Sequence, residues 1–340
     1  MKTNSNLLTY FLTRTLFLGG GISIMYELSQ RDAYISCFLG TLLGIAIIYI
    51  FSYFYQKINM PLKVYLQKKS IINIILKIVY SFYIIFLIFI ILIILSTFIY
   101  SYFLPFTPSF LSCLPFIFLA CYKCPKISST IYYIGFILLI LSLSIIILKT
   151  SLLSSELNIQ NILPIINVKP SKIILASFIY AILSTAPFLL TIGEPSTFNQ
   201  NIKYYILASF MNLLVITTLI LVLGDMVYIY SYPEYAGLRK IRFFNFIENI
   251  ENFISISWFY DIFIALSLAS LKIKDIFNTS KTNISFTISL ITLFIVSKYI
   301  STNFATSIQI YKVFPFILFA AMLLILILLI IKTNMKKHND

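Results

Sequence analysis

The sequence has few charged residues for its length. Charged side chains make up 11% of the 340 residues, whereas soluble domains carry roughly 25%. Hydrophobic residues make up 60%, and the mean hydropathy is +0.98. A water-soluble fold with this composition could not cover its apolar core with polar surface. The composition therefore excludes an ordinary soluble protein and predicts one whose solvent is the lipid bilayer.

Metal ligands and reactive groups are also scarce. The only histidine, His338, lies in the C-terminal tail, and the chain has four cysteines. Cys121 and Cys124 form a CxxC pair, but a zinc site needs further ligands that the sequence does not supply nearby. We interpret these thiols as incidental, with redox chemistry as the alternative. Because no nucleophile and base are paired either, we expect no metal, no cofactor and no enzyme activity.

Apolar stretches of membrane-spanning length, about 20 residues, recur along the whole chain. Lipid cannot satisfy backbone polar groups, so each stretch is expected to be a helix. No soluble domain of useful size fits between them. The sequence predicts an all-α integral membrane protein, a single polytopic domain over 1–340 with about ten transmembrane helices. The expected spans are near 7–29, 33–55, 74–101, 108–122, 128–148, 173–193, 204–224, 246–270, 283–301 and 311–332.

The net charge of +14 is carried by lysines and arginines that cluster at the ends of the apolar runs. This placement indicates membrane topology and attraction to anionic lipid rather than nucleic-acid binding. With the N-terminus inside, 16 of the 25 Lys and Arg residues fall on the inner side. We therefore expect both termini in the cytoplasm. The basic segment 239–242 is the exception, because it falls on the outer side.

Three consecutive glycines, Gly19, Gly20 and Gly21, interrupt the first span. Each loses roughly 1 kcal/mol against alanine in a helix. Either they form a notch for close helix packing, or they break the helix and expose backbone groups to a cavity. In a broken helix, the amides around Gly20, Gly21 and Ile22 could hold a carboxylate.

The sixth span carries a second irregularity. Pro187 and Pro195 flank Gly193 and Glu194, and Thr191 provides a hydroxyl. An acid near the end of an apolar run is costly unless it faces water or a partner. Glu194 either caps a helix end at the cytoplasmic interface or acts as a ligand-binding residue or proton carrier.

The first and sixth spans are five apart, which suggests an internal repeat. Interrupted helices at corresponding positions of two halves are typical of inverted-repeat transporters, with the site between them. The sequence thus predicts a five-plus-five transporter fold with broken helices one and six. The first repeat would cover about 7–148 and the second about 173–332, although no repeat is visible residue by residue.

The eighth span contains the remaining acids of interest. Glu248 and Glu251 share one helix face near the first turn, where acids favour the helix dipole, although a coupling role is the alternative. Asp261 lies deeper in the span among aromatic residues. An ionised aspartate at that depth costs roughly 2.5–3.5 kcal/mol, so it needs a partner, a proton or water. Arg14 and Lys298 are the candidate partners.

Three stretches together resemble a known family, the B subunits of endospore nutrient-germinant receptors, or GerAB-type spore germination permeases. These permeases are similar to the amino acid–polyamine–organocation transporter superfamily. Asn249 stands where the family pattern has an arginine, which puts a cross-helix ion pair from that position in doubt. The stretches are Gly19-Gly20-Gly21 to Tyr34; Gly193-Glu194; and the block Leu223-Gly224-Asp225, Tyr232-Pro233-Glu234 and Phe246 to Glu251 with Trp258.

The resemblance implies a pocket between broken helices one and six, lined by helices three and eight. It also implies a nutrient ligand such as an amino acid, A- and C-type receptor subunits as partners, and residence in a bacterial cytoplasmic membrane, the spore inner membrane. Our leading hypothesis is a germinant-receptor subunit. A proton-coupled amino acid permease on the same fold is the main alternative, and a lipid-handling or polysaccharide-export protein is a third.

Overall fold

The computed structural model describes residues 7–58, 70–123, 128–191, 198–230, 232–240, 250–277, 283–302 and 304–337. Within these ranges the chain is helical and contains no strand. The main elements are α1 (Leu7–Leu16), a π-helical turn η1 (Phe17–Gly21), α2 (Ile22–Ser29), α3 (Ala33–Ile58), α5 (Ile71–Tyr102), α6 (Ser109–Ile117), η3 (Phe118–Lys123), α7 (Ser128–Leu152), α8 (Pro170–Thr191), α9 (Phe198–Leu223), η7 (Gly224–Ile229), α10 (Pro233–Leu238), α11 (Ile250–Phe277), α12 (Asn283–Thr302) and α13 (Phe304–Lys337).

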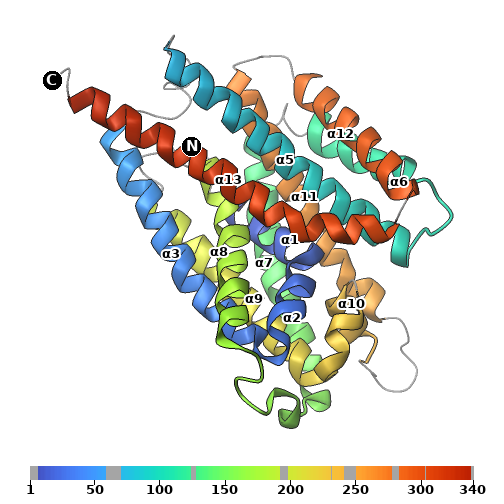
Figure 1. The fold of residues 1–340 in the computed structure, drawn as a ribbon. Helices are drawn as coiled ribbons and strands as arrows, with labels where there is room; N and C mark the ends of the chain where they lie inside the picture. The colour runs from blue at the N-terminus through green and yellow to red at the C-terminus, as the bar shows by residue number, and fades with distance from the viewer. Residues whose placement is uncertain are drawn as a thin grey trace.

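Each of the ten stretches expected from the sequence overlaps a helix or a pair of consecutive helices. Seven helical stretches of the described residues are long and apolar enough to cross a membrane, and Ser109–Lys123 and Ile284–Lys298 are shorter apolar helices. One of the seven, Ile22–Lys57, contains a change of chain direction near Gln30, whose φ is 46°. Figure 1 shows α2 and α3 as two separate arms that meet there. The all-helical membrane fold is confirmed, while the number of crossings and the repeat stay predictions.

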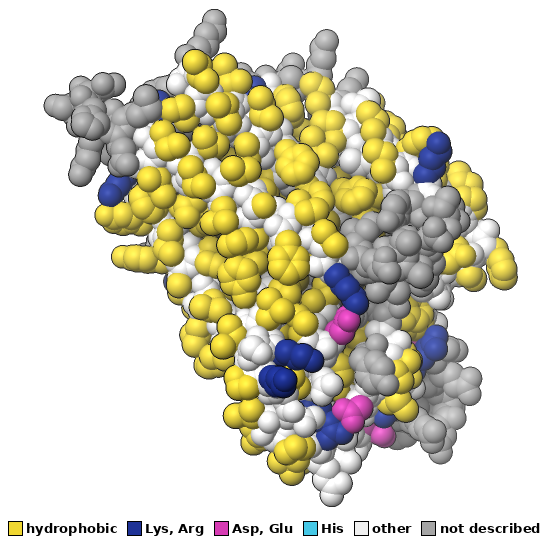
Figure 2. All heavy atoms as spheres, in the orientation of Figure 1, with side chains coloured by type: hydrophobic (Ala, Val, Ile, Leu, Met, Phe, Trp, Pro, Cys, Tyr) yellow, Lys and Arg dark blue, Asp and Glu magenta, His cyan; other side chains and the backbone are white. Residues whose placement is uncertain are grey.

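The outer surface of the bundle is apolar. Ile71, Ile78 and Phe82 on α5 are 77%, 63% and 53% exposed. Figure 2 shows hydrophobic side chains over most of one face, with the few charged groups in its lower half and at its edges. Exposed apolar area of this extent is unstable in water but suits contact with lipid tails.

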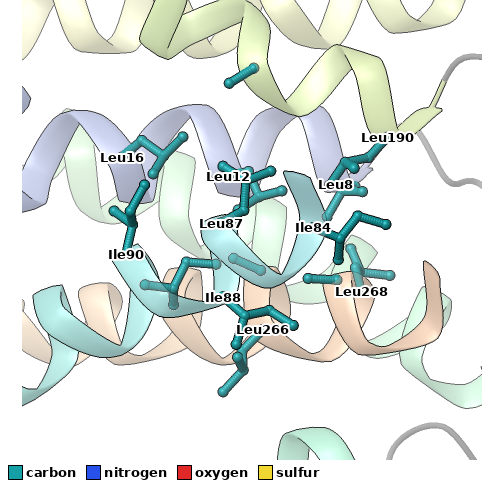
Figure 3. Close-up of a cluster of buried hydrophobic side chains, with 14 of the residues drawn as sticks. Leu8, Leu12, Leu16, Ile84, Leu87, Ile88, Ile90, Leu190, Leu266 and Leu268 are labelled. Atoms are coloured by element: carbon teal, nitrogen blue, oxygen red, sulfur yellow. The ribbon is translucent and has the colours of Figure 1, made fainter. Parts of the chain in front are cut away.

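Helix α1 forms the centre of the bundle. All ten of its residues are buried, and it packs against α8, α9 and α11. Figure 3 shows Leu8, Leu12 and Leu16 in a row along α1, facing isoleucines and leucines of α5. A spacing of four residues keeps such side chains on one side of the helix. A helix buried all round can carry polar groups only where neighbouring helices satisfy them.

Close packing of α3 on α8 depends on two glycines four residues apart, Gly40 and Gly44. A Cβ atom at Gly40 would lie 2.5 Å from the carbonyl oxygen of Ser177, and one at Gly44 would overlap the Tyr205 hydroxyl. Small residues at this spacing let helix backbones approach closely in membranes. The pair fixes α3 against α8 and, through Tyr205, against α9.

A buried carboxylate anchors the loop that precedes α8. Both oxygens of Asp32, which has no exposed surface, accept hydrogen bonds from the loop backbone. The amides of Ile166, Asn167 and Val168 donate at 2.9, 2.7 and 3.1 Å. The loop is therefore tied to the turn between α2 and α3.

Candidate ligand site

Four charged side chains are buried together beside α1. Arg14 of α1 is 1% exposed, Lys149 of α7 is 2%, Glu234 of α10 is 3% and Asp261 of α11 is 1%. We call this set the buried charge cluster. Two cations face two anions, so the cluster is neutral as a whole, which is the condition under which charges persist in an apolar interior.

Glu234 lies between the two cations of the buried charge cluster. Its Oε1 forms an ion pair with Nζ of Lys149 and lies 4.0 Å from Nη2 of Arg14. The other terminal nitrogen of Arg14, Nη1, donates a 2.8 Å hydrogen bond to Oδ1 of Asn212 on α9. Arg14 is thus held by α9 on one side and directed toward Glu234 on the other.

Asp261 approaches the same cations from α11. Its carboxylate is hydrogen-bonded to Ser142 of α7 and lies within electrostatic reach of Arg14 and Lys149. The Ser142 hydroxyl is in turn 3.3 Å from the hydroxyl of Tyr10 on α1. The two acids therefore reach the cations from different helices, with Tyr10 and Ser142 on the side of Asp261.

Several polar atoms of the buried charge cluster are not hydrogen-bonded. Among the described residues, Oε2 of Glu234, Oδ1 of Asp261 and Nε of Arg14 are buried without a hydrogen-bond partner. The indole nitrogen of Trp258 on α11 is in the same condition. A buried polar atom left unpaired costs about 1–3 kcal/mol, more if charged. Such atoms around paired charges mark a place suited to water or to a polar ligand.

The three glycines of the first span form the π-helical turn η1 with Phe17 and Leu18. The backbone keeps right-handed helical angles, with φ −61° and ψ −42° at Gly21. The amide of Ile22 donates to the carbonyl of Phe17. The interruption is therefore a π turn rather than an unwound segment, and the Ile22 amide is used within the helix. Such turns occur frequently at functional sites.

A chain of contacts connects the π turn to the buried charge cluster. Nδ2 of Asn212, the residue that holds Arg14, donates to the hydroxyl of Tyr180 on α8 at 3.3 Å. The Tyr180 ring packs edge-on against the ring of Phe17, with 5.4 Å between centroids. These contacts place the π turn, α8 and the cluster in one packed unit.

The first and sixth spans, in which the sequence shows its irregularities, pack directly together as α1 and α8. The Thr13 hydroxyl donates to the carbonyl of Ser184 at 3.0 Å. Among known proteins, the family model described as spore germination protein matches residues 7–305. The chain belongs to the spore germination protein family. No curated protein matches the chain at a significant level.

The family match confirms the resemblance drawn from the sequence. It begins at the first residue of α1 and runs into the start of α13, so it includes every residue of the buried charge cluster. With its apolar helices, this spore germination protein is a multi-pass membrane protein of the receptor or permease type.

The structure places only part of the predicted site residues of the germination protein. Helix α8 continues through Pro187 and ends at Thr191. Gly193 and Glu194 lie outside the described residues, as does Glu248. Glu251 lies in the first turn of α11 and is 8% exposed.

Of the two partners predicted for Asp261 in the germination protein, the structure places Arg14 within electrostatic reach of its carboxylate. Lys298 is exposed, with its ammonium 5.2 Å from the ring centroid of Phe294. The fifth span expected from the sequence ends at residue 148, but α7 extends past Lys149 to Leu152. The available signal was its position seven residues after Ser142, which puts both on one helix face.

Aromatic rings hold α10 of the germination protein against α5 and α11. The ring of Phe98 lies 4.7 Å from Trp258 and 5.2 Å from Tyr232, measured between centroids. Tyr102 lies 4.3 Å from Tyr235. Since Glu234 belongs to α10, this ring cluster positions one of the two acids of the buried charge cluster.

Proposed function

We propose that the protein is the membrane subunit of a germinant receptor that binds an amino acid or a similar small zwitterion. The observation that carries this proposal is the buried charge cluster, in which two cations and two anions are only partly satisfied by one another. An amino acid carries a carboxylate and an ammonium a few ångströms apart, so it matches a site with both signs of charge. The site lies on the central helix, next to the π turn.

In this proposal, Arg14 and Lys149 bind the carboxylate of the ligand. Arg14 is suited to the task because its guanidinium presents parallel donors to a carboxylate. Asp261 binds the ammonium through the oxygen that lacks a partner among the described residues. The side chain of the ligand would then lie toward α5 and the aromatic rings of α11.

The glycine segment contributes the second part of the proposed site. Gly19, Gly20 and Gly21 have no side chains, so a ligand can approach the backbone of the π turn closely. Ile22 closes the turn, and a shift from π to α hydrogen bonding there would accompany binding.

Residues at the end of the sixth span complete the proposed site. We assign Thr191, Gly193 and Glu194 to the same ligand. Receptor function implies A- and C-type subunits as partners and a location in the spore inner membrane with both termini in the cytoplasm.

A proton-coupled amino acid permease is the second candidate. The observation that favours it is the buried carboxylate of Asp261 with an oxygen that lacks a partner among the described residues, because such a group can gain and lose a proton during a transport cycle. Glu251 and Glu248, at the start of the same span, would pass the proton onward.

The experiment that separates the two candidates measures binding and uptake on one preparation. The purified protein is reconstituted into liposomes, and labelled amino acids are added with and without an imposed proton gradient. Saturable binding without accumulation is the expected result for a receptor. Accumulation driven by the gradient would establish the permease, and the absence of any binding would overturn both candidates for amino acid ligands.

A further inference from the structure

We propose that Glu234 occupies the carboxylate subsite of the ligand, and that an incoming carboxylate displaces it and releases α10. This inference rests on the proposed function, because it uses the same two cations as the carboxylate-binding groups. Ligand binding would thereby change the packing of α10 against its neighbours.

The two acids of the buried charge cluster are not equivalent. Asp261 belongs to α11, a helix of 28 residues that crosses the bundle. Glu234 belongs to α10, which has only six residues. Withdrawal of Asp261 would require a spanning helix to move, whereas withdrawal of Glu234 requires only a short segment to shift.

The cationic site persists when Glu234 leaves. Arg14 keeps its 2.8 Å hydrogen bond to Asn212, and both cations keep their electrostatic contact with Asp261. The exchange replaces one carboxylate by another, so each cation remains paired. Breaking a buried ion pair without replacement would leave an uncompensated charge, which is strongly unfavourable. A carboxylate is therefore the chemical group that can remove Glu234 at low cost.

Further hydrogen bonds and ring contacts of α10 are made by side chains, which can form them again after α10 shifts. The Tyr235 hydroxyl donates to Oδ1 of Asn252, and the Tyr235 ring lies 6.4 Å from that of Trp258. Nζ of Lys240, just after α10, donates to the carbonyl of Val222 at 2.8 Å. These hydrogen bonds and ring contacts are made by side chains of α10 and of Lys240, so α10 can shift while its own helical hydrogen bonds stay intact.

Trp258 is a built-in reporter for this movement. It is the only tryptophan of the chain and is 3% exposed. Its ring lies against Phe98 and near Tyr232 and Tyr235. Release of α10 would uncover the indole, so its fluorescence emission would shift to longer wavelength.

The test titrates the protein in nanodiscs with sodium acetate, with methylammonium chloride as the control that lacks a carboxylate. We expect acetate to cause a saturable red shift of Trp258 emission and methylammonium to cause none. In Glu234→Gln, which keeps the shape of the side chain but not its charge, the emission should already be shifted and acetate should add little. The matched control is Glu27→Gln, whose carboxylate pairs with Lys312 at the surface. It should respond like the wild type.

A second readout is the affinity for labelled amino acids. Glu234 competes with the ligand carboxylate for the two cations, so the apparent affinity of the wild type is reduced to the fraction of sites that Glu234 leaves free. Without this competition, Glu234→Gln should bind labelled amino acids about tenfold more tightly than the wild type. Glu234→Gln leaves two cations facing one anion, so the comparison uses only the protein that elutes as a monodisperse peak. Unchanged or weaker binding by that protein, or an unshifted emission, would overturn the inference. If amino acids bind but acetate leaves Trp258 unchanged, the proposed function stands and the displacement fails. If acetate shifts Trp258 but amino acids do not bind, the displacement stands and the amino acid proposal fails.

Discussion

The guanidinium of Arg14 on α1 donates a 2.8 Å hydrogen bond to the side-chain oxygen of Asn212 on α9. The bond fixes one of the two terminal nitrogens of Arg14 and leaves the other facing Glu234 at 4.0 Å. A buried arginine held in this way has its position set by an uncharged neighbour, so its positive charge remains available to an anion.

Charge balance in the buried charge cluster should decide its stability. Asp261→Leu leaves two cations facing one anion, and loss of one member of a buried pair costs about 3–5 kcal/mol. We expect a clear fall in the apparent melting temperature, measured by fluorescence-detected size-exclusion chromatography. The double variant Asp261→Leu with Lys149→Met restores the balance and should recover most of the loss. A double variant less stable than the single one would contradict this view.

The glycine segment should be needed for binding but not for folding. Gly20→Leu places a large side chain on the π turn, so we expect it to abolish binding of labelled amino acids. The variant should still elute as a monodisperse protein with its apparent melting temperature lowered only slightly. Gly20→Ala serves as the size control and should retain partial binding. Normal binding by Gly20→Leu would exclude the π turn from the ligand site.

Helix α3 should depend on Gly44 for its approach to α8 and α9. A Cβ atom there would overlap the Tyr205 hydroxyl, so Gly44→Ala should destabilise the protein by about 1–3 kcal/mol. Gly135→Ala is the matched control, because its Cβ would lie 3.3 Å from the end of the Leu7 side chain. Tyr205→Phe in the Gly44→Ala background removes the overlapping oxygen and should recover part of the loss. Equal melting temperatures for Gly44→Ala and Gly135→Ala would refute the prediction.

The Asp32 carboxylate should govern the order of the loop before α8. In Asp32→Asn only one side-chain atom can still accept, so of the three backbone donors at 166–168 at least one loses its partner. The loss of such bonds costs about 1–3 kcal/mol. We expect amide hydrogen exchange in a peptide covering 163–169 to accelerate about tenfold or more. Glu156→Gln, an exposed acid in the same connection between α7 and α8, should leave that exchange unchanged.

The helices were predictable because composition and hydropathy determine them strongly in a membrane. The sequence also singled out the first span and Asp261, since three adjacent glycines and a deep acid are each costly in lipid. The close packing of α3 could also have been predicted, because Gly40 and Gly44 have the small-residue spacing typical of membrane helix contacts. That signal was missed.

The buried charge cluster as a whole could not be predicted from the sequence. Lys149 and Glu234 lie at the edges of apolar runs, where a charged residue normally faces water, and only the packing of α7 and α10 buries them. Asn212 carries no charge and sits in an ordinary apolar helix. The form of the glycine interruption was also unpredictable, because a π turn and an unwound segment have the same sequence requirement.

The most direct test of zwitterion binding at the buried charge cluster is a scintillation proximity assay with a panel of labelled amino acids. It compares the wild type with Arg14→Gln and with Arg31→Gln, whose arginine pairs with Asp225 at the surface. We predict saturable binding of at least one amino acid to the wild type and to Arg31→Gln. In Arg14→Gln the affinity should fall about 100-fold, as expected when a charged contact worth about 3 kcal/mol is lost. Equal affinity of Arg14→Gln and the wild type, or no binding by any of the three proteins, would contradict a site at Arg14.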